Sequence, residues 1–194
     1  MSEKKMIITI GREFGSGGHE IGKKLAAKLG INFYDKNLIE LAAEHSGLDL
    51  SILGSSDEKA PSPFVSPYAP TVSDQLYCAQ SEVIQKLAQT ESFVIVGRCS
   101  NAILEEVCTP LNIFIYAPLE DRIKRIMDRY LIDTPDKARK EILRTDKIRR
   151  GYYQYYSEFK WGDREGYDFM IDSSLLGIDG TVDILADLAL RKFN

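Results

Sequence analysis

Short apolar segments alternate with longer segments of helical periodicity along this 194-residue chain. Two of the apolar segments, residues 93–96 and 112–117, are hydrophobic at nearly every position, which is typical of strands buried on both faces of a parallel sheet. The alternation favours an α/β fold in which right-handed crossovers place helices on both faces of that sheet. We expect strands over residues 6–10, 31–35, 93–96, 112–117 and 167–172.

The helix expected to follow the segment 119–130 is the most informative of the helical segments. Thr134 and Pro135 have the residue types of an N-cap and a first helical position, and they predict a helix that runs to about residue 150. At 3.6 residues per turn, Ala138, Ile142 and Arg149 share one face, which turns Arg149 inward. Further helices are expected within residues 21–29, 38–45, 76–87, 119–130 and 182–190.

Residues 48–72 interrupt this pattern with a long segment that has neither helical nor strand periodicity. Pro61, Pro63, Pro67 and Pro70 bring four of the chain's seven prolines into this segment. Loops of this length in compact domains are usually functional or disordered. We therefore expect a long loop here, either functional or disordered.

Polar and glycine residues gather where the expected strands end. Ligands of open parallel sheets bind at the carboxyl ends of the strands. We therefore expect the functional site at that edge, among residues 11–18, Asp35, Gly97, Arg98, Pro118 and Asp172.

The glycine-rich turn between the first strand and the first helix fits neither standard nucleotide-binding motif. A dinucleotide fingerprint, G-x-G-x-x-G, placed on Gly15 and Gly17 would require glycine where Glu20 stands, although Asp35 occupies the expected place of a ribose-binding acid. A tight βα turn without a ligand is the structural alternative.

The P-loop motif G-x-x-x-x-G-K-[ST], aligned on Gly17, fails at three positions. Its first glycine is Arg12, its lysine is Gly18, and His19 replaces the hydroxyl residue. Backbone N–H groups of such a turn can still converge on a phosphate at the start of a helix.

Charge is distributed unevenly along the chain. The total is −4, yet residues 122–150 hold eleven basic and five acidic residues, so this segment carries +6 and the remainder −10. A negative total gives no long-range attraction to DNA, RNA or an anionic membrane surface. We expect a small anionic partner bound near the basic segment, and neither nucleic acid nor membrane.

The three cysteines show no C-x-x-C spacing, so neither a disulfide framework nor a zinc site is expected. The first residues, Met-Ser-Glu-Lys-Lys, contain no apolar segment of the kind found in a signal peptide, and no apolar run approaches membrane-spanning length. We expect a cytoplasmic protein.

Arg98 directly follows a buried strand, where a guanidinium group needs an anionic partner. Two partners are possible: a bound anion such as a phosphate, or a structural carboxylate such as Asp35. We favour the anion because the basic segment supplies a second positive wall.

Seven segments along the chain together suggest a family. They are Ile7–Ile21 with its glycine cluster, Phe33–Asp35, Val96–Arg98, Ala117–Arg122, Tyr152–Tyr153, Trp161–Asp163 and Ile171–Ser174. In this order, over nearly the whole chain, they resemble the cytidylate kinase-like family, which is similar to nucleoside monophosphate kinases of the P-loop superfamily. The resemblance implies a three-layer α/β/α fold with a five-stranded parallel sheet, a mobile acceptor-binding region and a lid.

The resemblance also implies roles for individual residues. It implies one domain over residues 1–194, with a core of about 1–47, 73–118 and 166–194, an acceptor-binding loop of about 48–72 and a lid of about 122–165. Gly15, Ser16, Gly17, Gly18 and His19 would hold the ATP phosphates, and Asp35 and Arg98 the acceptor. Five residues are expected to neutralise charge during phosphoryl transfer: Arg12, Arg98, Arg125, Arg149 and Arg150. Arg122 would be a further member of the lid.

One departure from the wider superfamily concerns the loop lysine, which neutralises the β- and γ-phosphates in ordinary P-loop kinases. Gly18 carries no charge. The candidates to replace the lysine are Arg12, His19, Lys23, Arg149 and Arg150, and the sequence does not choose among them. Ser16 or an acidic residue would have to replace the hydroxyl that binds Mg²⁺.

The function implied by the resemblance is ATP- and Mg²⁺-dependent phosphorylation of a nucleoside monophosphate, CMP or dCMP. Two alternatives stay open: a nucleotide-binding regulatory protein without turnover, and a kinase of another small metabolite.

Overall fold

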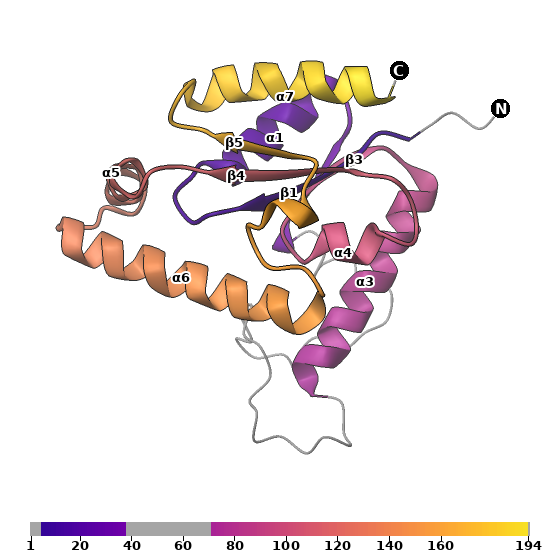
Figure 1. Cartoon of the computed structure of the whole chain (residues 1–194), viewed down its shortest axis with the longest axis horizontal. Coiled ribbons are helices and arrows are strands. Elements are labelled where there is room, and N and C mark those ends of the chain that lie inside the picture. Colours follow the sequence, from indigo (N-terminus) through magenta and orange to yellow (C-terminus); the bar gives the residue numbers. More distant parts are fainter. Residues whose placement is uncertain (1–4, 38–70, 194) are drawn as a thin grey trace.

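The computed structural model describes residues 5–37 and 71–193. Its centre is a five-stranded sheet in the order β2-β3-β1-β4-β5, and every pair of neighbouring strands is parallel. Helices lie on both faces of the sheet (Figure 1), which confirms the predicted three-layer α/β/α fold. The strands are β1 (Ile7–Arg12), β2 (Asn32–Tyr34), β3 (Phe93–Val96), β4 (Leu111–Tyr116) and β5 (Phe169–Asp172).

Strand β1 extends further than the sequence predicted. We expected it to stop before Gly11, but Gly11 and Arg12 continue the ladder and pair with Phe114 and Ile115 of β4. A Cβ atom on Gly11 would lie 2.8 Å from the side chains of both Phe114 and Tyr167. Glycine is therefore used here for the close approach of two aromatic rings to the strand, and not to end it.

One face of the sheet is covered by α1 (Gly18–Leu29) and α7 (Gly177–Phe193), which pack against each other (Figure 1). Successive residues of a strand point to opposite faces. Ile8 and Ile10 of β1 accordingly join this core, while Ile7 joins the core on the other face. The helix side contributes fully or nearly fully buried residues, among them Ile21, Leu25, Leu185 and Ala189.

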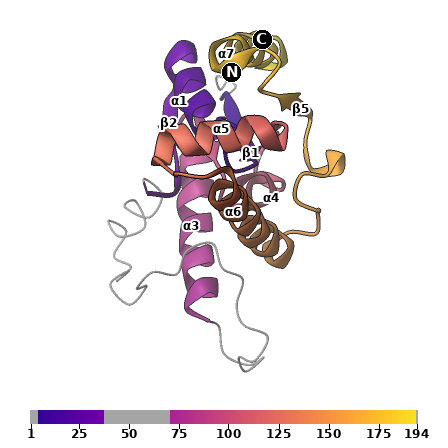
Figure 2. The same ribbon diagram turned by 90° about the vertical axis from the view of Figure 1, so that its left-hand side faces the viewer.

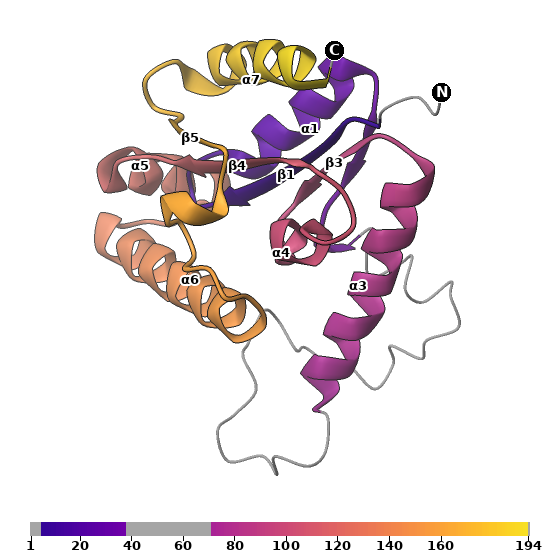
Figure 3. The same cartoon turned by 45° about the vertical axis from the view of Figure 1, so that its right-hand side comes forward.

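The opposite face is covered by α3 (Val72–Thr90) and α4 (Ser100–Leu104), which lie next to each other (Figure 3). Ile84 of α3 is fully buried against Phe93 and Ile95 of β3. Burial of a side chain of this size contributes about 1.5–3 kcal/mol. Helix α3 begins with a capping box, in which the Thr71 and Asp74 side chains each bind the other's backbone N–H.

Helices α5 (Leu119–Tyr130) and α6 (Pro135–Tyr156) follow β4 and pack against each other at the carboxyl end of the sheet (Figure 2). Thr134 caps α6 as predicted, by accepting a hydrogen bond from the Lys137 N–H. The helix runs six residues past the expected end at residue 150. Tertiary packing explains the extension, because Tyr156 stacks on Tyr77 of α3 with ring centroids 3.9 Å apart.

The helix expected within residues 38–45 and the loop expected over residues 48–72 lie outside the described residues, apart from the last two residues of that loop. A short 3-10 helix, η2 (Arg164–Gly166), precedes β5. Within residues 5–37 and 71–193, no helix is long and apolar enough to cross a membrane.

Candidate functional site

The glycine-rich loop joins β1 to α1 and has the backbone shape of an anion-binding turn. Gly15 and Gly17 have left-handed φ values of 84° and 83°, and Ser16 lies between them. Alternation of this kind turns successive N–H groups toward one concave side. Gly17 is the N-cap of α1 and has no side chain to bind the first N–H groups of the helix. These donors remain available for a phosphate, and the helix dipole favours negative charge there.

Ser16 holds the loop in shape and does not present its hydroxyl to a ligand. Its side chain is fully buried, and Oγ donates a hydrogen bond of 2.9 Å to the Glu13 carbonyl. Its own carbonyl accepts a 2.6 Å hydrogen bond from the buried Ser173 hydroxyl, which follows β5. The Ser16 hydroxyl therefore braces the turn, and the Ser16 N–H donates a further hydrogen bond of 3.3 Å to the same Glu13 carbonyl.

Three charged side chains clamp the loop to the two helices of the expected lid. Arg122 of α5 is buried; its Nη1 lies 2.6 Å from the Asp146 carboxylate of α6, and its Nε lies 3.5 Å from Glu13. Asp146 also accepts a 2.7 Å hydrogen bond from the N–H of Phe14. Burial raises the pKa of Glu13 against the opposing effects of Arg122 and the Ala117 N–H. Two carboxylates thus engage Arg122, which we had expected to face phosphates.

A second polar cluster lies where β3 ends. Gly97, Arg98 and Cys99 have consecutive positive φ values of 84°, 60° and 53°. A left-handed conformation costs a non-glycine residue roughly 1–2 kcal/mol, and such strain is found most often at functional sites. The strained turn buries Arg98 to 3% exposure, with its guanidinium carbon 5.7 Å from the centre of the Tyr152 ring.

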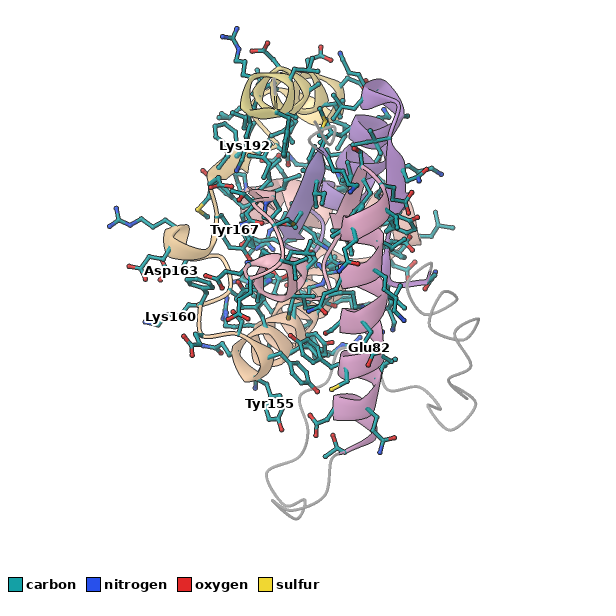
Figure 4. All side chains as sticks on the ribbon, turned by 90° about the vertical axis from the view of Figure 1, so that its right-hand side faces the viewer. Glu82, Tyr155, Lys160, Asp163, Tyr167 and Lys192 are labelled. Atoms are coloured by element: carbon teal, nitrogen blue, oxygen red, sulfur yellow. The ribbon has the colours of Figure 1, made fainter. Side chains whose placement is uncertain are left out.

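Arg98 lines a small cavity of about 30 Å³ beneath the carboxyl ends of β1 and β3. Four aromatic residues form part of its other walls: Tyr152, Tyr153, Trp161 and Tyr167. Tyr167 lies on the inner side of the connection before β5, whereas Asp163 and Lys160 lie along its outer side (Figure 4). Burial raises the pKa of the Tyr167 phenol, which therefore stays protonated and neutral. The cavity thus combines cationic groups with flat apolar walls.

A larger cavity, of about 260 Å³, lies over the glycine loop. Gly15, Gly17, Gly18 and His19 form its floor, and Arg125 lines it from α5. Nη1 of Arg125 donates a 2.8 Å hydrogen bond to the Gly15 carbonyl, which leaves its remaining N–H groups beside the loop. The lining also includes Arg129 and Tyr130 at the end of α5.

The two cavities share Arg12 and Arg149 in their walls. Arg149 is turned inward as predicted: Nη1 lies 3.4 Å from the Arg12 carbonyl, and the guanidinium stands 5.4 Å from the centre of the Phe14 ring. Cations therefore stand at the boundary between the glycine-loop cavity and the Arg98 cavity. A ligand phosphate at that boundary would meet positive charge from the strand and from the lid helix.

Three expected site residues lie at the edges of this arrangement. His19 Nε2 is 2.9 Å from the Asp35 carboxylate, so a phosphate-binding candidate and an acceptor-binding candidate contact each other. Asp35 does not belong to the lining of the Arg98 cavity. Arg150 is exposed and lies 5.5 Å over the Trp161 ring, on the outer side of the same cavity.

Sequence reasoning missed four residues of the site. Asp146 had been counted only as one acid within a basic segment, and no local pattern could pair it with Phe14, which is 132 residues away. Glu13 gave no signal beyond its place in the glycine loop. Arg129 had been counted only among the basic residues of that segment, and Tyr130 only as an apolar position of the helix over residues 119–130, but both line the glycine-loop cavity.

No group of three or more potential metal ligands occurs among residues 5–37 and 71–193. Mg²⁺ in phosphoryl-transfer sites is usually held by one or two carboxylates together with waters and substrate phosphates. The Glu13 carboxylate beside the loop is compatible with that pattern. The described residues near the loop thus fit a metal that arrives with a nucleotide.

Comparison with known proteins adds a family to this geometry. The model of the cytidylate kinase-like family matches residues 7–175, which is most of the chain. The chain belongs to the cytidylate kinase-like family. Proteins named cytidylate kinase from Ignicoccus hospitalis and Methanocaldococcus jannaschii are 23% and 28% identical to it. The alignments cover 95% and 93% of this chain and 99% and 96% of theirs.

Solved structures agree with this family assignment at the level of fold. An uncharacterized protein from Eubacterium ventriosum is 32% identical and superposes with a TM-score of 0.77 over 95% of this chain and 98% of that one. A shikimate kinase from Acinetobacter baumannii shares the fold with a TM-score of 0.55 at 15% identity, over 98% and 96% of the two chains. The cytidylate kinase-like family and the kinase fold support a nucleotide kinase-like role for this chain.

Proposed function

We propose that this cytidylate kinase-like protein transfers the γ-phosphoryl group of ATP, with Mg²⁺, to a nucleoside monophosphate. The observation that supports this most directly is the pair of adjoining cavities that share Arg12 and Arg149. A kinase must hold a donor and an acceptor phosphate in line and shield both from water, and it needs positive charge where they meet.

The glycine-loop cavity is the proposed donor site. Gly15, Ser16, Gly17, Gly18 and His19 would hold the ATP phosphates, chiefly through backbone N–H groups at the start of α1. Arg125 stands beside them and would neutralise charge from the lid side. Mg²⁺ would bind between the phosphates and a nearby carboxylate, for which Glu13 is the candidate in the loop itself.

The Arg98 cavity is the proposed acceptor site. A buried guanidinium gives bidentate hydrogen bonds to a phosphate, and aromatic walls give a stacking surface for a base. We place CMP or dCMP first among the acceptors, since relatives named cytidylate kinase match nearly the whole chain. Asp35, which contacts His19 at the edge of the glycine-loop cavity, is the proposed second acceptor-binding residue.

The proposed division of the chain keeps the bounds that the family resemblance implies. Residues 1–47, 73–118 and 166–194 form the core, residues 48–72 the acceptor-binding loop, and residues 122–165 the lid that carries Arg125, Arg149 and Arg150. The acceptor is already a phosphate, so the reaction needs no general base. The side chains position both substrates and neutralise the charge that develops between them.

The test incubates the pure full-length protein with ATP, Mg²⁺ and each nucleoside monophosphate in turn, and separates the products by ion-exchange chromatography. We expect a diphosphate product with the greatest yield from CMP or dCMP. Arg98→Ala should raise the KM for the monophosphate by about tenfold or more, since it removes a charged hydrogen-bonding partner of the acceptor. Arg191→Ala, on the exposed face of α7, is the matched control.

Absence of a diphosphate with every monophosphate would overturn the proposal. Product formation unaffected by Arg98→Ala would remove Arg98 from the acceptor site. The missing loop lysine favours one second candidate, a nucleotide-binding regulatory protein. That candidate predicts a rise in melting temperature with ATP and no turnover.

A further inference from the structure

Relative to the P-loop motif, this chain exchanges the residue types at two positions. The motif has glycine where Arg12 stands and lysine where Gly18 stands, with five residues between the two positions. The chain therefore also has one glycine and one basic residue at these two positions, but the basic residue is at position 12 and the glycine is at position 18. Arg12 is the last residue of β1, and Gly18 is the first residue of α1.

The structure shows that the two positions share one space. A Cβ atom on Gly18 would lie 2.6 Å from Cβ of Arg12 and 3.0 Å from its Cγ. Cβ atoms do not approach so closely, and the atom in the way is the root of the side chain, which cannot rotate aside. A side chain can therefore extend into the loop from position 12 or from position 18, but not from both.

The Arg12 side chain runs from this point toward the end of β3. A Cβ atom on Gly97 would lie 3.0 Å from the Arg12 guanidinium carbon and would overlap its Nη1. Gly97 has a φ of 84°, so glycine is required there for the backbone as well as for space. The guanidinium group thus ends beside the Arg98 turn, at the boundary of the two cavities that it lines.

The other four candidate cations are less well placed. His19 contacts Asp35, and Arg150 is stacked on Trp161. Lys23 is exposed on α1 and lies outside both cavities. Arg149 reaches the boundary only from the lid, through the Arg12 carbonyl and the Phe14 ring.

We propose that Arg12 takes the place of the P-loop lysine in this protein and that Gly18 is glycine to make room for it. This inference rests on the proposed kinase function. An oxygen of the acceptor phosphate forms the new bond to the γ-phosphorus as the bond to the β–γ bridging oxygen breaks, and that electron pair leaves with ADP. Arg12 stays protonated throughout and neutralises the charge shared by the β- and γ-phosphates.

The decisive experiment is the reciprocal exchange, Arg12→Gly with Gly18→Lys, which rebuilds the regular motif. Arg12→Gly alone should lower kcat by roughly 10²-fold or more, as loss of one transition-state donor does. Gly18→Lys alone should also lose activity and melt at a lower temperature, because its Cβ overlaps that of Arg12. The double variant should recover about tenfold or more over either single variant, a non-additivity expected of directly coupled sites.

Losses that simply multiply in a folded double variant would overturn the inference, as would an Arg12→Gly variant as active as Arg191→Ala. If the exchange variant does not fold by circular dichroism, Arg12→Lys and Arg12→Gln decide instead. The inference requires the lysine variant to keep much more activity than the glutamine variant.

A binding measurement separates this inference from the proposed function. Arg12→Gly should weaken Mg-ATP by about tenfold or more in calorimetric titrations and leave AMP within about twofold, because AMP has no β- or γ-phosphate. If the wild type forms no diphosphate, the kinase proposal fails, and this comparison still tests Arg12. Equal weakening of both nucleotides would reject the assignment.

Discussion

Replacing Asp146 with alanine tests whether the loop is held by charge. The change removes the partner at 2.6 Å from Nη1 of Arg122 and the acceptor of the Phe14 N–H at 2.7 Å. Both side chains are more than nine-tenths buried, so solvent cannot replace the lost carboxylate. Removing one partner of a buried ion pair costs about 3–5 kcal/mol. Glu13 remains as a second carboxylate, 3.5 Å from Nε of Arg122. Because Arg122 keeps this partner, we expect a loss of unfolding free energy near the lower end of that range.

The assay is urea unfolding at pH 7, followed by the fluorescence of Trp161, which is the chain's one tryptophan. We expect Asp146→Ala to lower the free energy of unfolding by about 3 kcal/mol. Asp146→Asn keeps an acceptor for Phe14 and should lose less. The double variant Arg122→Met/Asp146→Leu should be more stable than Asp146→Ala, since no buried charge is then left alone. A loss below about 1 kcal/mol for Asp146→Ala, or a double variant less stable than it, would refute this account.

Three further predictions concern the core and pH. Glu13→Gln removes a carboxyl whose pKa is raised by burial. A carboxyl with a raised pKa binds its proton more tightly in the folded state than in the unfolded state, so it contributes stability at low pH. As the pH rises above 4.5, the ordinary pKa of the group, the wild type should lose stability relative to the variant in unfolding titrations. Gly11→Ala should cost about 1–3 kcal/mol in urea unfolding, because its Cβ would overlap Phe114 and Tyr167. Gly30 has a φ of 67° and no atom within 4 Å of an added Cβ, so Gly30→Ala should cost only about 1 kcal/mol of backbone strain. An equal loss of unfolding free energy for Gly11→Ala and Gly30→Ala would contradict the packing argument.

Local patterns in the sequence were sufficient for the layers of the fold. The strand runs and the four-residue spacings predicted the parallel sheet and the helices α1, α3, α5, α6 and α7, and they indicated the edge where the candidate site lies. They also placed Arg149 on the inner face of α6, since helical periodicity relates residues that are close in sequence. The Thr134 cap was predicted for the same reason.

Contacts between distant segments were beyond such patterns. Gly11 was taken as the end of a strand, because its reason for being glycine is the packing of Phe114 and Tyr167 from other elements. The end of α6 was misplaced because Tyr77 of α3 extends it. Arg122 was expected to face phosphate, and only the folded chain brought Asp146 to it.

The sequence by itself determined an α/β chain with a lysine-less glycine loop and a basic segment facing it. It left five cations as candidates to replace the lysine, because a motif records residue types along one line and not the space they occupy. In the tertiary structure, a Cβ atom at position 18 would overlap the Cβ atom of Arg12, and the Arg12 side chain extends to the boundary of the two cavities. Steric exclusion between a strand end and a helix start is a three-dimensional constraint, and that constraint singles out Arg12.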